Sequence, residues 1–419
     1  MRSSVVMLCA VGATALLVRL VAAVATDGLW NPELNEYASL ARNMLRGDGF
    51  TYSHHGVVYF SFAPPMHAWL TAGSYWLFDS IVPLMLLQLA SGAALAVVVA
   101  MIASHLFGGW RAGAAAGLLV ALHPGLVVYS ATKAHPLAFD ALFFSLALLQ
   151  SYRLVEYTTI RRAVALGVIV GIGTLSRATI IIFLPIAGLW LLMVTPRTSW
   201  WRVVRSAVVA GLCASAIVAP WTIRNTLLHH QFVFLLTTDS DDFWRGNNPF
   251  ATGHSYVDDT RIVLDLMPAE ERLDLLRQPD ELAQREWFST HAWEFIRANP
   301  ERFVSLTVTK FFYFWWFAPQ TGVLYPQVWR LMYQVYYGGA LIFAFVGVRR
   351  LAREGGPPVA KALVLGAFLL SLSALQSLYY VEGRHRWAVE PMLLALSGGG
   401  IAALVDRGRR QWSRGLTVA

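Results

Sequence analysis

The sequence predicts an all-α membrane protein with about ten transmembrane helices, interfacial helices in its first outer loop and a small outer loop domain. Three observations support this fold class. Hydrophobic residues make up 56% of the 419 residues and charged residues only 14%, against roughly a quarter charged in soluble domains. The apolar residues occur in long runs. The arginines gather at the ends of these runs, as the positive-inside rule describes.

Runs of roughly 20 apolar residues predict the membrane spans. We expect them near 5–25, 81–104, 112–130, 136–155, 163–176, 178–195, 203–222, 329–348, 359–380 and 387–405. The segments on either side of Arg177 are short, so we interpret them as a hairpin, with one long tilted helix as the alternative. The first run is also similar to a cleavable signal peptide, but its length favours a retained span.

The arginines predict the orientation of the spans. The groups that should be cytoplasmic are Arg161-Arg162, Arg197 with Arg202 and Arg205, Arg349-Arg350-Arg353, and the tail from Arg407 to Arg414. Both termini are then inside, and the active site faces outward from what we expect to be a bacterial plasma membrane. The chain divides into a transmembrane module at 1–222 with an outer loop at 26–80, an outer region at 223–328, and C-terminal helices with a tail at 329–419.

The first outer loop contains a predicted interfacial helix that bears two carboxylates. Asn31 can cap this helix, Pro32 suits its first turn and Gly47 can end it. Glu33 borders its apolar face, and Glu36 follows at i+3. The apolar face comprises Leu34, Tyr37, Ala38, Ala41, Met44 and Leu45.

Further outer segments should be helical without spanning. Segment 66–78 is apolar but too short to cross, and a span at 303–317 would break the alternation of charge between the two sides. The stretch 223–302 is the only sizeable polar region. Its predicted helix near 280–298 has an apolar stripe, so we expect a small outer cap packed on the membrane domain.

Ionisable residues at the outer ends of helices are candidates for function. The candidate acids are Asp27, Glu33 and Glu36. The alternative is that they are solvated loop carboxylates, or that Glu33 only favours a helix N-terminus. The candidate cations are Arg177, Arg224, Lys310, Arg384 and Arg386. They could instead anchor the chain to lipid headgroups, but two arginines between neighbouring spans would attract a phosphate strongly.

Other classes of function are disfavoured. The net charge of +8 does not form a dense basic stripe, so we expect no nucleic acid partner. Cys9 and Cys213 lie in apolar runs and should be small buried hydrophobes. The adjacent histidines His54 and His55 should point apart, and no spacing typical of metal ligands occurs. The acids at 239, 241 and 242 could bind a hard cation, but a solvated loop is more frequent.

Four stretches make the chain similar to a known family. They are Glu33 to Gly49, Ala63-Pro64-Pro65-Met66, Leu175-Ser176-Arg177, and Pro220 to Asn225 followed by Gly246-Asn247-Asn248-Pro249. Through them the chain resembles the polytopic glycosyltransferases of the GT-C superfamily, particularly the family 39 and aminoarabinose-transferase-like group. The resemblance implies inverting transfer of a hexose or pentose from a polyprenyl-phosphate carrier to a lipid, glycan or protein acceptor.

The resemblance also implies roles for single residues. The first-loop acid of the family acts as general base, and register with Tyr37 places it on Glu33, whereas a looser register gives Glu36 and Asp27 is the third candidate. The outer cations would bind the donor phosphate, with the substrate contacting Tyr37, Tyr59, Asn247, Asn248 and His135. Phe62 and Ala63 stand where some relatives have an acidic residue before the double proline. The resemblance therefore leaves open whether a divalent metal binds.

A transporter or lipid-linked-sugar flippase is the main alternative function, and a non-catalytic scaffold is the third. A transporter would place charges and internal repeats around a site at the membrane midplane. The sequence has no convincing repeat, and most of its charges lie at helix ends. These features favour the transferase.

Overall fold

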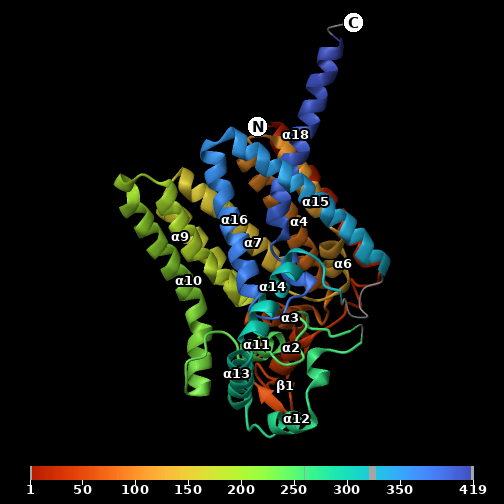
Figure 1. The fold of residues 1–419 in the computed structure, drawn as a ribbon, viewed down its shortest axis with the longest axis vertical. Coiled ribbons are helices and arrows are strands. Elements are labelled where there is room, and N and C mark those ends of the chain that lie inside the picture. The colour runs from red at the N-terminus through yellow and green to blue at the C-terminus, as the bar shows by residue number, and fades with distance from the viewer. Residues whose placement is uncertain (1, 259, 320–326, 417–419) are drawn as a thin grey trace.

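The computed structural model describes residues 2–258, 260–319 and 327–416, without the side chains of residue 2 and of 408–416. Helices dominate the described part, whose strands form one hairpin of β1 (Tyr52–His54) and β2 (Val57–Tyr59). Both ends of the chain lie at the top of Figure 1, and the long loop regions gather at the bottom. The predicted fold class, an all-α polytopic protein, is confirmed.

Every predicted span coincides with helical structure. By length and composition, six of the described helices could cross a membrane, or seven if a bent pair counts as one span. The helical segments at the predicted spans are α1 (Arg2–Ala25), α4 (Val82–Phe107), α5 (Trp110–Ala121) with α6 (Pro124–Thr132), α7 (Leu137–Glu156), α8 (Ile160–Ser176), η1 (Ala178–Ile182) with α9 (Phe183–Val194), α10 (Trp200–His229), α15 (Gln327–Glu354), α16 (Gly356–Gln376) and α18 (Glu390–Leu416).

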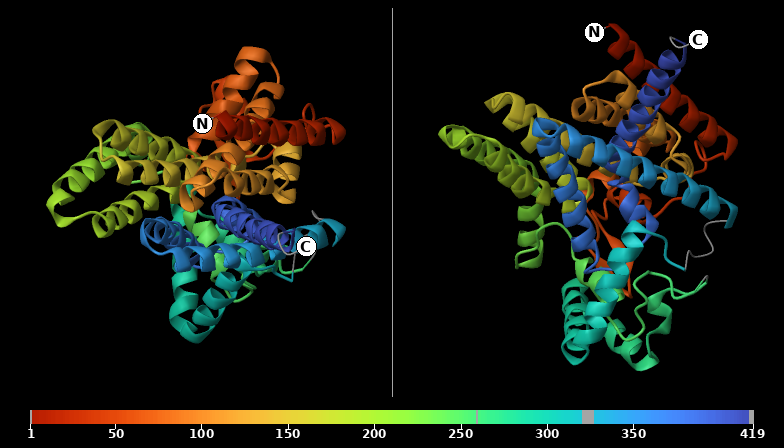
Figure 2. Two further views of the ribbon diagram at one scale, coloured as in Figure 1. Left: turned by 90° about the horizontal axis from the view of Figure 1, so that it is seen from above. Right: turned by 45° about the horizontal axis from the view of Figure 1, so that its top comes forward.

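These helices form one connected bundle, seen from above in Figure 2, in which α18 contacts α4 and α5 and α7 lies between α4 and α8. Helix α1 packs against α4 and α5, α8 packs against α10, and α15 packs against α18. Small residues let the backbones approach closely, as is typical of helix pairs in membranes. At the α8–α10 contact, a Cβ on Gly167 would overlap the carbonyl oxygen of Ala210. The segments 163–176 and 178–195 are separate helices, as the hairpin interpretation requires.

The predicted span at 112–130 is bent rather than straight. Helices α5 and α6 meet at an angle of 47°. His123 lies between the two helices and caps the start of α6, because its Nδ1 accepts the backbone N–H of Leu126 at 3.0 Å. Pro124 then fits the first position of α6, where its missing N–H costs nothing. The bend brings His123 into the centre of the bundle, where it is fully buried.

The first loop folds as α2 (Glu36–Arg46), the β hairpin and α3 (Pro65–Phe78). The predicted helix start at Asn31 and Pro32 is wrong, since α2 begins at Glu36. Residues before it are extended because Glu33 forms a parallel bridge with Lys133, in which its N–H donates to Thr132 O at 2.8 Å. The predicted end at Gly47 is correct, with a left-handed φ of 92°.

The apolar face of α2 also differs in part from the prediction. Its buried residues are Tyr37, Ala38, Leu40 and Ala41. Leu34 precedes the helix and is 38% exposed, while Leu45 is 45% exposed. Helix α2 therefore packs with its first turns on α3 and leaves its last turn at the surface.

The second loop region forms the predicted cap. Its core consists of Trp244, Val263, Met267, Leu275, Trp287, Phe288 and Ala292. Glu281 joins the cap to the first loop, because its carboxylate accepts the N–H groups of Phe60 at 2.8 Å and Ser61 at 3.3 Å. Helix α10 continues to His229, past its expected end at 222. The remaining short helices are η2 (Arg197–Ser199), α11 (Asp239–Gly246), η3 (Val263–Leu266), α12 (Ala269–Leu276), α13 (Glu281–Ala298), α14 (Pro300–Trp315) and α17 (Gly383–Trp387).

Candidate active site

A cavity of about 630 Å³ lies where five distant segments meet. The wall is formed by the first loop, α6 with the residues after it, His254 and Tyr256 of the second loop region, the α14–α15 region and α17. Trp316, Phe317, Trp329 and Trp387 give one part of this wall an aromatic surface. Its charged residues are Glu33, Glu36, Glu382, Lys133, Arg330, Arg384 and Arg386. One cavity wall thus combines carboxylates, cations and an aromatic surface. Such a wall suits a ligand that has both a charged part and an apolar part.

Glu33 and Lys133 form an ion pair at the wall of the cavity. The Lys133 Nζ lies 2.5 Å from Glu33 Oε2, and the two side chains are 14% and 58% exposed. The backbone bridge between the same two residues fixes their spacing. Gln88 supports the lysine from behind, because its side-chain amide donates to Lys133 O at 2.8 Å and accepts the N–H of His135 at 3.1 Å. An exposed carboxylate and a largely buried ammonium thus share one site.

Glu36, the first residue of α2, is less exposed than Glu33. It is half-buried and lines the cavity. Tyr37 lies behind it in the core, where burial first and the Glu36 charge second raise the phenol pKa well above its ordinary value. Tyr37 does not line the cavity. Asp27 is exposed outside it, and its carboxylate accepts the side-chain N–H of Asn31 at 2.7 Å.

Arg384 is the cation of α17 that remains available to a ligand. Its Nε lies 2.8 Å from Glu382 Oε2, and a third of its side chain is exposed. Burial acts to raise the pKa of Glu382, but Arg384, His385 and His254 outweigh it and lower this pKa to about 2. The hydroxyl of Ser255 also donates to Glu382. The ion pair with Glu382 therefore holds the arginine at the cavity wall.

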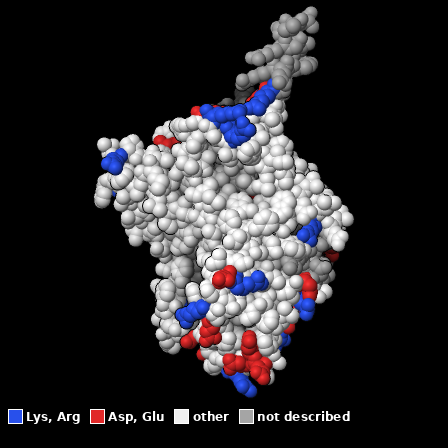
Figure 3. All heavy atoms as spheres, viewed as in Figure 1, with Lys and Arg blue, Asp and Glu red and all other residues white. Residues whose placement is uncertain are grey.

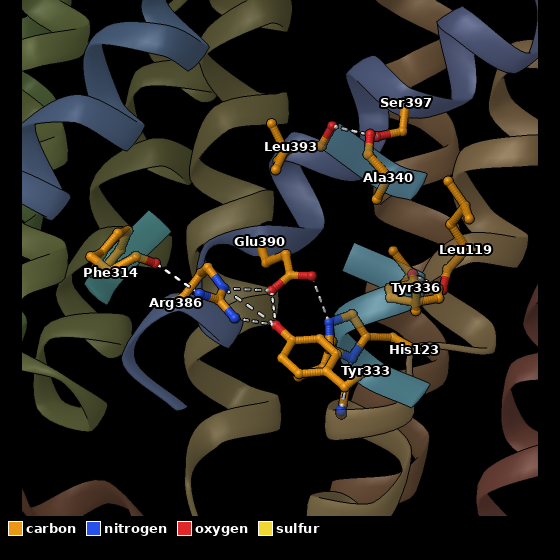
Figure 4. A network of polar contacts seen from close by, with 12 residues as sticks. Leu119, His123, Phe314, Tyr333, Tyr336, Ala340, Arg386, Glu390, Leu393 and Ser397 are labelled. Carbon is orange, nitrogen blue, oxygen red and sulfur yellow. Dashed lines mark hydrogen bonds and ion pairs between the residues drawn. The ribbon is translucent and has the colours of Figure 1, made fainter. Parts of the chain in front are cut away.

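Arg386 lines the same cavity but is fully engaged by the protein (Figure 4). Its Nε lies 3.2 Å from Glu390 Oε2, and its Nη2 donates to the hydroxyl of Tyr333 at 2.8 Å. Its Nη1 donates to two carbonyl oxygens at the end of α14. Glu390 also accepts from Tyr333 at 2.5 Å and pairs with His123 at 3.0 Å. This network ties α6, α14, α15, α17 and α18 together, so Arg386 shapes the wall.

The other three predicted cations lie outside the cavity. Arg224 donates to Phe60 O at 2.6 Å, at the junction of α10 and the first loop. Arg177 pairs with the buried Asp140 at 3.3 Å. Lys310 is fully buried and donates to Gly246 O and Asn247 Oδ1, each at 3.1 Å. The structure thus brings Arg384 and Arg386 together with the acids, but not these three.

Of the five predicted substrate contacts, only His135 lines the cavity. Burial, and then the charge of Arg384, lower its pKa well below the ordinary value, so the ring is neutral. Tyr37 and Tyr59 are core residues, and Tyr59 donates to Gln284 at 2.8 Å. Asn247 and Asn248 are buried and donate to backbone carbonyl groups inside the fold.

Lys133 and Arg330 are cavity cations that the sequence reasoning missed. Lys133 is a lone cation at the predicted outer end of a span, which is the same signal that selected Arg177. Arg330 lies near the start of α15 and donates to the carbonyl groups of Pro319 and Ala318. Its sequence position resembles an ordinary interfacial anchor, so no sequence signal separates it from the other arginines.

One group of described residues could hold a metal ion, and it lies outside the cavity. The nearest ligand atoms of His54, His55 and Asp241 lie within 4.8 Å of one another. The prediction that the two rings point apart is wrong, because His55 adopts φ 45° in the hairpin turn and the ring centroids are 3.8 Å apart. Two imidazoles and a carboxylate suit a transition metal. Arg245 opposes a cation there, since it donates to both Asp241 oxygens.

The chain is similar to proteins of known type. Residues 63–223 match the family described as dolichyl-phosphate-mannose-protein mannosyltransferase. No curated protein matches. The structure of ArnT from Cupriavidus metallidurans bound to undecaprenyl phosphate superposes with a TM-score of 0.57 at 17% identity, covering 99% of this chain and 63% of that chain. The apo ArnT structure gives a TM-score of 0.52 at 18% identity, covering 99% and 62%.

The chain therefore spans about 63% of the length of the ArnT chain that it matches. The similarity extends over nearly all of this chain and confirms the expected architecture. The matched family segment runs from the double proline before α3 to α10, and so includes two of the stretches on which the resemblance rests and part of a third. The chain therefore has the fold of ArnT.

Proposed function

We propose that the protein is an inverting glycosyltransferase that takes its sugar from a polyprenyl-phosphate carrier. The observation that carries this proposal is the cavity that Glu33, Glu36, Lys133 and Arg384 line together. The ArnT structure of the same fold was solved with undecaprenyl phosphate, and the matched family is described by a dolichyl-phosphate sugar donor. The acceptor would be a lipid, glycan or protein at the outer face, and the sugar a hexose or pentose.

Glu33 is the base in this proposal. Its carboxylate accepts the proton of the acceptor hydroxyl while the acceptor oxygen attacks the anomeric carbon of the sugar. The bond between that carbon and the phosphate oxygen breaks, and polyprenyl phosphate leaves with the bonding electron pair. One displacement of this kind inverts the anomeric centre. The side chain is 58% exposed, so an acceptor can reach it.

Lys133 and Arg384 bind the departing phosphate. Negative charge grows on the phosphate as the bond breaks, and cations held by the protein stabilise that charge most in the transition state. Without donor, Lys133 pairs with Glu33. A bound phosphate competes for the ammonium, which releases the carboxylate as a base. Donor binding and activation of the base are thereby coupled through one lysine.

The direct test measures polyprenyl phosphate released from a labelled donor by purified protein. Glu33→Gln keeps the shape and removes the proton acceptor, so turnover should fall by about a hundredfold or more. Donor binding should survive or strengthen, because Lys133 loses its anionic partner. Asp27→Asn is the matched control, since this exposed carboxylate lies outside the cavity, and it should retain normal turnover.

Glu36→Gln completes the set, because Glu36 lines the same cavity. If Glu36→Gln abolishes turnover and Glu33→Gln does not, Glu36 is the base. If the folded wild-type protein releases no polyprenyl phosphate but moves the intact lipid-linked sugar between leaflets, the transferase proposal is wrong and the flippase alternative replaces it.

A further inference from the structure

A second cavity lies at the opposite end of the bundle, between the last turns of α15 and residues 403–407 of α18. It has a volume of about 400 Å³. Figure 3 shows lysine and arginine side chains gathered at this end, where α18 leaves the bundle. The charged residues of its wall are Arg349, Arg350, Arg353, Glu354, Asp406 and Arg407. It shares no residue with the candidate active site.

The cavity exists because two helices touch and then diverge. At the crossing, a Cβ on Gly347 would overlap the carbonyl oxygen of Leu396, and one on Gly400 would overlap that of Phe343. The backbones are therefore in direct contact at this point. About one turn further along, the helices separate and the cavity opens between residues 345–354 and 403–407. The cavity therefore borders the close crossing of α15 and α18 at the glycines.

Three arginines of the wall have no anionic partner among the described residues. The two carboxylates of the wall are engaged elsewhere, since Glu354 pairs with Arg350 at 2.7 Å and Asp406 pairs with Arg111 of α5 at 2.6 Å. Arg349, Arg353 and Arg407 are exposed and remain unpaired in this part of the chain. Guanidinium groups bind phosphate oxygens with paired donors.

The rest of the wall is apolar and continuous with the membrane-facing surface. Phe345 and Leu404 are 63% and 43% exposed, and both line the cavity. A soluble anion would meet this apolar surface without benefit, whereas a lipid would place acyl chains on it and its headgroup among the arginines. Basic pockets between transmembrane helices near the headgroup level bind anionic lipids in this way.

We propose that this cavity is a binding site for an anionic phospholipid, best filled by one whose headgroup carries two phosphodiesters, such as diphosphatidylglycerol. Its two phosphodiester charges balance the net charge of +2 that four arginines and two carboxylates give to the wall. The lipid would wedge between α15 and α18 and hold them at their divergence. This site is independent of the sugar transfer proposed for the other cavity.

The test measures lipid binding to the purified full-length protein by native mass spectrometry and by the shift in thermal denaturation. Diphosphatidylglycerol should bind and raise the denaturation temperature, and phosphatidylcholine should do neither. Arg349→Gln with Arg353→Gln and Arg407→Gln should weaken binding by roughly tenfold or more. Arg161→Gln with Arg202→Gln and Arg205→Gln removes the same charge from exposed arginines outside the cavity, and should leave binding unchanged.

A second variant tests the cavity without changing its charge. Ala403→Phe fills the space beside the arginines and should also reduce binding, which keeps the proposal testable if the triple variant does not fold. Equal losses in the two triple variants would mean general attraction to the basic surface and would overturn the site. Protection by inorganic pyrophosphate equal to that by the lipid would assign the cavity to a soluble anion and overturn the lipid proposal.

Discussion

Lys310 and Asp242 are ionisable side chains of the cap region whose charge the fold penalises. Burial lowers the pKa of Lys310 to about 7 from its ordinary 10.5. Burial also raises the pKa of Asp242 to about 7 from 3.8, against the opposing charge of Arg245. The two groups affect stability in adjacent pH windows. The free energy of unfolding falls as the pH rises from about 4 to 7, because the unfolded state releases the Asp242 proton before the folded state does. It rises again from pH 7 upwards, because the folded state releases the Lys310 proton before the unfolded state does.

The lysine gives a measurable pH dependence. Below pH 7 both folded and unfolded states carry the charged lysine, and the folded state bears the full desolvation cost. Between about pH 7 and 10 the folded state releases its proton first, so stability rises with pH. We expect the denaturation temperature of the wild type to rise relative to that of Lys310→Met over this range. Denaturation temperatures of the wild type and Lys310→Met that stay parallel over this range would contradict the prediction.

The candidate site was predictable from sequence only in part at this scale. Charge at helix ends selected Glu33, Glu36 and Arg384, which the structure places around one cavity. The same reasoning could not tell that Arg384 is available to a ligand whereas Arg386, two positions further on, is engaged by the protein. The difference arises from tertiary partners, because Tyr333 and Glu390 engage Arg386 completely. Their catalytic and binding roles stay predictions until turnover is measured.

Helix α18 shows how an element is fixed by its neighbours. Its three consecutive glycines each face a different helix. A Cβ on Gly398 would meet Ala112 and Ala116 of α5, and one on Gly399 would meet the ring of Phe107 of α4. Gly400 faces α15 at the crossing described above. Glycine costs about 1 kcal/mol in a helix relative to alanine, and here the close packing on three sides offsets that cost.

This packing predicts opposite outcomes for two glycine substitutions. Gly400→Ala should lower the denaturation temperature, because its Cβ would overlap backbone atoms of α15 and overpacking costs about 1–3 kcal/mol. Gly366→Ala in α16 meets nothing within 4 Å and should leave the temperature equal or higher through helix propensity. Thermal denaturation of both variants in one detergent provides the measurement. Equal behaviour of the two would contradict the close crossing.

Element positions were largely predictable, but their ends and bends were not. Hydrophobic runs located a helical segment at each of the ten predicted positions, because length and apolarity in a bilayer leave few alternatives to a helix. Among the described helices, six or seven are long and apolar enough to cross a membrane. The start of α2 could not be predicted, since the bridge from Glu33 to Lys133 joins residues one hundred positions apart. The bend between α5 and α6 depends on the His123 cap and its contact with Glu390, which are also tertiary.

At the scale of the whole molecule, charge and architecture agree. Both termini lie at one end of the bundle, and the first loop and the cap lie at the other (Figure 1). The predicted cytoplasmic arginines 349, 350, 353 and 407 line the second cavity near the termini. The candidate active site lies near the loop end, which would allow a lipid-carried donor to enter from the leaflet on that side. Which end faces outward stays a prediction from the positive-inside rule.

Cysteine labelling in intact cells tests this orientation. A background without Cys9 and Cys213 receives one new cysteine at a time, at Ser53 of the hairpin or Thr252 of the cap. A membrane-impermeant maleimide should label both from outside. Thr198→Cys, in the exposed turn before α10, is the matched control and should react only after the membrane is permeabilised. Arginine side chains retained on the cytoplasmic side are the physical cause, so labelling of Thr198→Cys alone in intact cells would invert the orientation and place the proposed sugar transfer on the cytoplasmic face.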